Sequence, residues 1–299
     1  MTTFPGAKLR IGLLGTGPWA ERTHAPALAA HQGVEFSGVW GRRPEAAQAL
    51  AARCGTRAFE DADALFAASD AVALALPPDV QAPLAARAAA AGCHVILDKP
   101  VATSVPTARE LAGAVTAAGV ASVVFCTLRF AEPTARWIEE QTAAGGWFLG
   151  EAHWLGSLFA AGSASAYAAS PWRREKGGLW DVGPHVLSVY LPILGDVTSV
   201  TCAAGPADTR HLILRHTSGA SSTATLTLSA PPEAAEAALS LYGERGRVTM
   251  PRWDGALDAF GGAVDALLDA VRSGEPHPCD VRFGARLTEI LAEAETASV

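Results

Sequence analysis

The sequence predicts an α/β protein in which a doubly wound parallel sheet is followed by an α+β domain with a large, open, mostly antiparallel sheet. Over residues 1–125, short continuous apolar runs alternate with helical segments, as in parallel strands covered on both faces. Beyond residue 125, short alternating segments follow one another without helices between them, which is typical of an antiparallel sheet. The 299 residues are enough for two such domains, which we place at 1–125 and 126–299.

Each element is predicted from its own pattern and punctuation. In the first domain we expect strands at 9–14, 35–40, 71–76, 94–97 and 120–127, and helices at 20–31, 44–54, 79–91 and 104–118. In the second domain we expect helices at 133–143 and 184–194, an irregular segment at 145–178, strands at 197–204, 210–217, 220–229, 237–243 and 246–250, and two closing helices at 256–273 and 280–297.

The stretch that follows the first strand indicates a nucleotide site. Gly15-Thr16-Gly17-Pro18-Trp19-Ala20 matches the G-x-G-x-x-G/A pattern, and it stands between a strand and a helix. Gly15 permits a tight turn, Gly17 lets a pyrophosphate approach the backbone, and Ala20 lets the helix pack closely. The phosphates would then face the N–H groups at the start of the helix, with Trp19 near the nicotinamide.

Composition argues against several other functions. The net charge is −7 and no basic run occurs, so we do not expect a nucleic-acid partner. No apolar run is long enough for a membrane helix and no signal sequence is recognisable, so we expect a cytoplasmic protein. The five cysteines are scattered without a C-x-x-C pair, so we expect neither disulfides nor a metal site.

Two strand ends carry charged residues that suit a cofactor. Where the second strand ends, Gly41 replaces the acidic residue that usually binds a ribose 2′-OH, and Arg42 and Arg43 follow. Guanidinium groups would hold a 2′-phosphate, so the sequence favours NADP, with NAD as the other possibility. A solvated loop with two surface arginines is the alternative.

The third and fourth strands end in Pro77-Pro78 and Asp98-Lys99-Pro100. The prolines would form an apolar wall beside the cofactor. Lys99 would neutralise an alkoxide or transfer a proton, with Asp98 orienting it. Only three of the 23 cationic residues are lysines, which makes the position of Lys99 more notable. A surface charge is the alternative.

In the second domain, Asp181 and His185 are four residues apart and would share one helix face. We expect a helix to begin near Pro184, with Asp181 just outside its positive end and holding the imidazole. A carboxylate at a helix start beside a structural histidine is the alternative. Six residues that precede Asp181 could line a substrate pocket: Trp154, Tyr167, Trp172, Arg173, Lys176 and Trp180.

These motifs together resemble the glucose–fructose oxidoreductase/inositol dehydrogenase/rhizopine catabolism (Gfo/Idh/MocA) family. Residues 91–104 (AGCHVILDKPVATS) and 177–189 (GGLWDVGPHVLSV) are similar to its two characteristic segments. The departures are Gln81 for a histidine, Asp98 for a glutamate and Ser188 for an aspartate. The resemblance implies a Rossmann domain, NAD(P), a sugar or polyol substrate, and a homodimer or homotetramer formed through the second domain's sheet.

By motif position, the resemblance implies Lys99, Asp181 and His185 as the catalytic set. We therefore expect an NADP-dependent oxidoreductase that moves a hydride between nicotinamide and a carbonyl or secondary alcohol of a sugar-like or cyclic substrate. Two alternatives remain: a non-catalytic nucleotide-sensing protein of the same fold, and an enzyme acting on a C=C or C=N bond.

Overall fold

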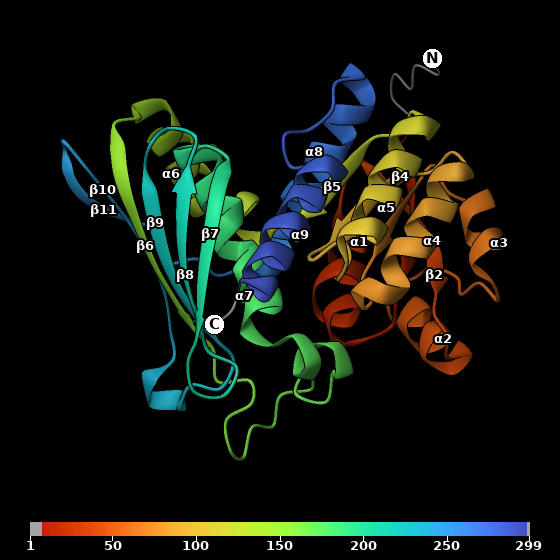
Figure 1. Ribbon diagram of the computed structural model, residues 1–299. Coiled ribbons are helices and arrows are strands. Elements are labelled where there is room, and N and C mark those ends of the chain that lie inside the picture. Colours follow the sequence, from red (N-terminus) through yellow and green to blue (C-terminus); the bar gives the residue numbers. More distant parts are fainter. Residues whose placement is uncertain (1–7, 298–299) are drawn as a thin grey trace. The chain divides into compact units, whose positions relative to one another are not determined.

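The computed structural model describes residues 8–297. These residues form two compact units (Figure 1). The first unit runs to residue 131 and also takes in residues 255–285, while the second holds residues 132–254 and the segment from 286 onward. The late segment 255–285 thus adds its helix to the unit built by the first part of the chain.

The first unit is built on a parallel sheet of five strands, in the order β2-β1-β3-β4-β5. The strands are β1 (Leu9–Leu14), β2 (Val34–Trp40), β3 (Ala71–Leu74), β4 (His94–Asp98) and β5 (Ser122–Phe125). Strand order reverses between β1 and β3, because β2 lies on one side of β1 and the later strands lie on the other. In such sheets a ligand binds outside the carboxyl ends of the strands at the point of reversal.

Helices cover both faces of this sheet, which explains the continuous apolar runs of its strands. Helix α4 packs against β4 and α5, while α8 packs against β4, β5 and α1. Their bounds are α1 (Ala25–Ala30), α2 (Pro44–Arg53), α3 (Ala62–Ala67), α4 (Pro78–Ala90), α5 (Val105–Ala118) and α8 (Ala256–Ser273). Within residues 8–297, no helix is both long enough and apolar enough to span a bilayer.

Two local features of the first unit differ from the prediction. The helix expected at 20–31 contains a π-helical turn, Ala20–His24, before α1 begins. Helix α3 was not predicted because it is only six residues long. Its signal is Asp61, whose side chain accepts a hydrogen bond from the Ala64 N–H at 2.7 Å and so caps the helix.

The second unit contains a six-stranded sheet in the order β11-β10-β6-β9-β8-β7. Neighbouring strands are antiparallel except β6 and β9, which are parallel, so the mostly antiparallel sheet is confirmed. The strands are β6 (Trp147–Leu155), β7 (Val197–Ala204), β8 (Arg210–His216), β9 (Ser221–Thr227), β10 (Glu236–Gly243) and β11 (Gly246–Thr249). Helices α6 (Glu132–Ala144) and α7 (Pro171–Leu194) pack together, and α7 packs on β6 and β9 (Figure 1).

The prediction of an irregular segment at 145–178 was wrong, because β6 lies within it at the centre of the sheet. Its residues that face α7 are partly small, which hid the strand pattern. A Cβ on Gly150 would lie 3.0 Å from the ring of Tyr190 and 3.1 Å from Leu194, so glycine lets α7 approach. Helix α9 (Val281–Thr296) closes the chain, beginning in the first unit's segment and ending in the second's.

Candidate active site

The glycine loop after β1 has the form that a dinucleotide requires. Gly15 has φ +124°, and a Cβ there would lie 2.4 Å from the carbonyl oxygen of Ala75, so only glycine fits. A Cβ on Gly17 would meet nothing within 4 Å, so this residue borders open space that a phosphate group can enter. The Gly17 carbonyl accepts the Glu21 N–H at 3.0 Å, so the helix starts directly after the loop. The loop therefore fits a bound pyrophosphate.

The other predicted residues of this loop are buried or half-buried. Ala20 is fully buried, as close packing of the helix on the sheet requires. Trp19 stacks on Phe125 at the end of β5, with ring centroids 6.2 Å apart. Thr16 and Pro18 are half-buried.

The end of β2 cannot hold a carboxylate without rearrangement. A Cβ on Gly41 would lie 2.7 Å from Cγ2 of Thr16, so the threonine of the glycine loop occupies the space that an acidic side chain would use. Arg42 and Arg43 follow and are exposed. Neither arginine forms an ion pair with a residue in the described part of the chain. The strand end is thus positively charged and has no acid at its tip.

The segments after β3 and β4 meet through a buried glutamine. Pro77 precedes α4 as its N-cap and Pro78 is buried at its first position. Gln81, fully buried in α4, hydrogen-bonds the backbone of Asp98 and Pro100. The Asp98 carboxylate accepts the backbone N–H of Lys99 at 2.9 Å, and Lys99 itself is half-buried. Lys99 therefore stands at the carboxyl edge of the sheet, directly after β4.

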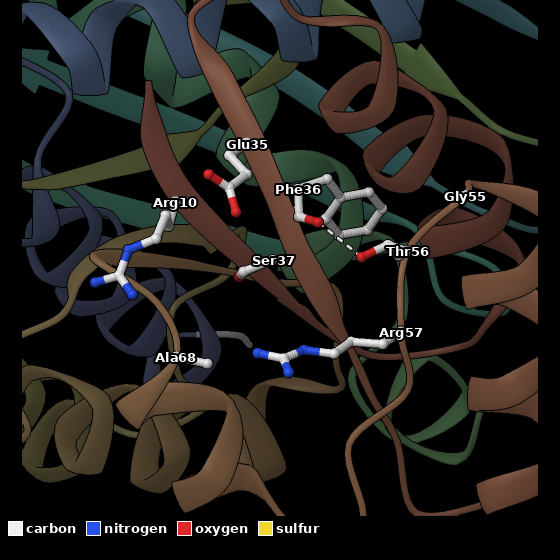
Figure 2. A pocket seen from close by; sticks show the side chains of 8 residues that line it. All are labelled: Arg10, Glu35, Phe36, Ser37, Gly55, Thr56, Arg57 and Ala68. Atoms are coloured by element: carbon white, nitrogen blue, oxygen red, sulfur yellow. Dashed lines mark hydrogen bonds between the residues drawn. The ribbon is translucent and has the colours of Figure 1, made fainter. Parts of the chain in front are cut away.

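A cavity lies toward the amino ends of β1 and β2, away from the glycine loop, and Figure 2 shows its lining. It measures about 430 Å³ and is polar. Arg10 is already bound to Asp70 at 2.6 Å, Arg57 lies over the Phe59 ring at 4.5 Å, and Glu35 adds a negative charge. Because its charges are balanced and it lies at the wrong end of the strands, this cavity does not compete with the glycine loop as a cofactor site.

In the second unit, two glycines shape the helix that carries Asp181 and His185. Gly177 has φ +62° and interrupts α7, so the helical segment that follows begins at Gly178. A Cβ on Gly178 would lie 2.7 Å from the backbone of Thr227, so glycine lets α7 approach β9 closely. The helix start predicted near Pro184 was wrong, because these glycines set it earlier. Asp181 therefore lies inside the helix, near its beginning, and not outside it.

Asp208 holds this helix start in place. Its Oδ2 accepts the N–H of Gly178 at 2.8 Å and that of Leu228 at 2.9 Å, while Oδ1 accepts the Thr227 hydroxyl at 2.7 Å. Burial acts to raise the pKa of Asp208, but hydrogen bonds from Ser229, Thr227, Leu228 and Gly178 outweigh it and lower that pKa. The residue is thus held as a carboxylate that ties α7 to β9. Sequence reasoning missed it, since a lone aspartate in a turn carries no motif.

Asp181 and His185 are both nearly buried, with 8% of each residue exposed. Arg173 forms an ion pair with Asp181, with 3.2 Å between Nε and Oδ2. The imidazole of His185 stacks on Trp154 of β6, with ring centroids 4.7 Å apart and an angle of 12°. Ser188, which stands in place of the expected aspartate, donates to the His185 carbonyl at 2.8 Å. Arg173 thus holds the Asp181 carboxylate, and stacking on Trp154 holds the plane of the His185 ring.

The six predicted substrate residues fall into separate groups. The guanidinium of Arg173 lies over Trp172 at 4.5 Å and over Tyr167 at 5.2 Å, so these three join Asp181 in one cluster. Trp180 is fully buried, and its Nε1 donates to Glu295 at 3.1 Å. Lys176 binds the same carboxylate at 3.0 Å. Trp180 and Lys176 thus hold α7 to the end of the chain, a role that the sequence did not indicate.

Comparison with known proteins identifies both parts of the chain. Residues 9–125 match the model of an oxidoreductase family described as having an NAD-binding Rossmann fold. Residues 141–249 match the model of the GFO/IDH/MocA C-terminal domain. Together the two matches cover well over half of the chain.

The chain is also similar to individual relatives and to a solved structure. A dTDP-3,4-didehydro-2,6-dideoxy-α-D-glucose 3-reductase from Streptomyces violaceoruber is 42% identical over 34% of this chain and 31% of its own length. A D-glucoside 3-dehydrogenase from Escherichia coli is 29% identical over 65% of this chain and 56% of its own length. The chain thus matches from a third to just over half of these relatives. The WlbA dehydrogenase of Bordetella pertussis, solved with NADH and UDP-GlcNAcA, shares the fold with a TM-score of 0.83 at 24% identity, covering 97% of this chain and 96% of that one. The chain belongs to the Gfo/Idh/MocA family of oxidoreductases, and its first unit carries that family's NAD-binding Rossmann fold.

Proposed function

We propose that this protein is an NADP-dependent oxidoreductase that transfers a hydride between nicotinamide and a carbonyl or secondary alcohol of a sugar-like substrate. The observation that carries the proposal is the placement of Lys99. It stands at the carboxyl edge of a parallel sheet whose glycine loop borders open space and has no room for a side chain at Gly15. The activities named for the relatives, a sugar 3-reductase and a glucoside 3-dehydrogenase, support a sugar-like substrate.

The cofactor would be held by residues of the first unit. The backbone of Gly15 to Ala20 would bind the pyrophosphate, and Pro77 and Pro78 would border the nucleotide. Arg42 and Arg43 support NADP over NAD, because they leave a positive strand end and Gly41 leaves no carboxylate to repel a 2′-phosphate. When bound, NADP supplies the hydride acceptor or donor at the nicotinamide ring.

The protein's own part is proton transfer and charge stabilisation at the substrate oxygen. His185 would donate or accept the hydroxyl proton, and the stacking on Trp154 holds the plane of its nearly buried imidazole. Asp181, which forms an ion pair with Arg173, would position that histidine. Lys99 would stabilise the negative charge that develops on the oxygen.

Activity measurements on Lys99→Ala and His185→Ala test this assignment. Purified protein with NADP⁺ would be screened against glycosides and nucleotide sugars, with NADPH formation as the signal. Each variant should lose turnover by about a hundredfold or more while NADPH still binds. Near-normal turnover in both variants would refute the assignment. Tight NADPH binding without turnover on any substrate in the wild type would favour a nucleotide sensor.

We further propose that two or more copies associate through the face of the second unit's sheet that α7 leaves uncovered. Gly150 faces α7, so the alternate residues Glu151 and His153 lie on the other face. Thr223 of β9 is in register with Glu151, and Ile213 of β8 is in register with Thr223, so both lie on this face. The side chain of Ile213 is exposed, at 53%. An exposed sheet face that carries a large apolar residue supports association between copies.

A further inference from the structure

The side chain of Gln81 makes a set of hydrogen bonds around the lysine that the proposed function places in the active site. Gln81 lies in the first turns of α4 and is 0% exposed. Its Oε1 accepts the N–H of Asp98 at 2.7 Å, and its Nε2 donates to the carbonyl of Asp98 at 2.9 Å and to that of Pro100 at 3.4 Å. One amide thus binds the backbone on both sides of Lys99.

The position of these bonds follows from the lengths of the strands. β3 ends at Leu74, and its register with β4 runs only from Ala71 opposite His94 to Ala73 opposite Ile96. Asp98 extends two residues beyond that register, where β3 has already turned into α4. Its N–H and C=O would lack a partner on that side, at a cost for each buried group. The Gln81 amide presents one acceptor and one donor there, as a neighbouring strand would.

We propose that Gln81 is a positioning residue that fixes the backbone of Asp98 to Pro100 and thereby aims the Lys99 side chain at the reacting oxygen. The inference rests on the proposed function for the role of Lys99, but the bonds themselves do not. A lysine side chain is long and flexible, so its placement depends on a fixed Cα position. A shift of about 1 Å in a catalytic group is enough to lower turnover markedly.

The chemistry of the amide predicts how substitutions at position 81 rank. Gln81→Leu removes both partners and leaves the Asp98 backbone unpaired. Gln81→Glu keeps an acceptor for the Asp98 N–H but brings a second oxygen toward two carbonyls, which is repulsive. Gln81→His can donate from one ring nitrogen and accept at the other, so it should retain most of the function.

The scarcity of lysine gives a test that does not depend on turnover. The chain has lysine only at Lys8, Lys99 and Lys176. Reductive methylation with ¹³C-formaldehyde therefore yields three dimethyl-lysine NMR signals besides that of the N-terminus, each assigned with a Lys→Arg variant. In Gln81→Leu the Lys99 signal should shift or broaden while the other two stay in place. Hydrogen exchange of the Asp98 amide should become about tenfold faster, as expected for the loss of one net hydrogen bond.

Ser69→Ala is the matched control. Ser69 donates a buried hydrogen bond to the Leu65 carbonyl at 2.8 Å in the same unit, and no hydrogen bond joins it to Lys99. Its loss should lower thermal stability like Gln81→Leu without moving the Lys99 signal. An unchanged Lys99 signal in Gln81→Leu, or an equal shift in Ser69→Ala, would overturn the proposal.

A double-mutant cycle then connects the position of Lys99 with turnover. Gln81→Leu alone should lower turnover by about tenfold to a hundredfold, and Gln81→His should restore it. In a Lys99→Ala background, Gln81→Leu should have no further effect. Equal losses in both backgrounds would show that Gln81 acts through something other than Lys99. If Lys99→Ala itself leaves turnover unchanged, the proposed function fails, while the NMR result still decides whether Gln81 positions the lysine.

Discussion

His24 lies just after the glycine loop, and its ring is enclosed by other rings. The centroid of Phe260 is 4.0 Å away and that of Phe125 is 5.8 Å away. Burial lowers the pKa of His24 from 6.5 to about 3. The folded protein therefore keeps this imidazole neutral at pH values where the unfolded chain would protonate it.

The stability of the protein should consequently rise with pH between about 3 and 6.5. In this window the unfolded state binds a proton that the folded state does not, so the stabilisation is complete above pH 6.5 and is lost as the pH falls toward 3. The shift corresponds to roughly 5 kcal/mol at most. Urea denaturation across this range should show a weaker pH dependence in His24→Leu. The control His211→Gln, on an exposed histidine, should keep the wild-type dependence, and identical slopes in all three proteins would contradict this account.

Arg42 and Arg43 carry the prediction of cofactor preference. Exchanging Arg42 for glutamate would replace the proposed phosphate ligand by a group that repels phosphate and attracts a ribose hydroxyl. Arg42→Glu should therefore weaken NADPH binding by about tenfold to a hundredfold and leave NADH binding unchanged or tighter. Arg272→Glu, in the last turn of α8, is the charge-matched control. Fluorescence titration measures both affinities, and equal losses for the two cofactors would argue against contact with a 2′-phosphate.

At this scale the sequence predicts the residues that belong to motifs and misses those that act on distant segments. Gly15, Gly17 and Lys99 stand where their motifs place them. Gln81 and Asp208 were missed as structural supports, because each acts on a backbone that the fold alone brings near. Gln81 reaches Asp98, and Asp208 reaches Gly178, across long stretches of chain.

Among the elements, α7 depends most on a single side chain. Asp208 accepts three hydrogen bonds, one from the N–H of Gly178 in α7 and two from Thr227 and Leu228 at the end of β9, and so joins the two elements. Asp208→Ala should lower the free energy of unfolding by about 1 to 3 kcal/mol, because buried N–H groups lose their acceptor. Denaturation monitored by circular dichroism measures this loss. A change below about 0.5 kcal/mol would show that the contacts are not structurally important.

The stability of α7 should also depend on pH, here because hydrogen bonds lower the pKa of Asp208. Because the pKa of Asp208 is lowered, its stabilisation is present at pH values above the ordinary aspartate pKa and is lost as the pH falls through the lowered pKa.

The strand β6 and the start of α7 were mispredicted because of two glycines. Gly150 and Gly178 are small because neighbouring elements approach closely, and this requirement is invisible in local periodicity.

For the whole molecule, the fold class was predictable because it follows from the order of elements. Buried apolar runs separated by helices specify a parallel sheet, and the later strands specify a second sheet. The parallel pairing of β6 with β9 was not predictable, since strand order depends on contacts far apart in sequence.

Association between copies belongs to the same scale. Ile213 is an exposed apolar residue on the uncovered face of the second sheet. Ile213→Lys should shift the protein toward the monomer in analytical ultracentrifugation, because a charge would be buried in the interface. Leu257→Lys, an exposed apolar residue of the first unit, should leave the assembly unchanged. A wild type that sediments as a monomer at all concentrations would exclude the proposed association.

Titration of the purified protein with NADPH and with NADH, followed by fluorescence, tests the central claim most directly. The account predicts saturable binding of both, with NADPH at least about tenfold tighter, as expected from a charge-assisted contact to the 2′-phosphate. Absence of binding to either cofactor would contradict it, because every catalytic role proposed for Lys99 and His185 depends on a dinucleotide held by the glycine loop.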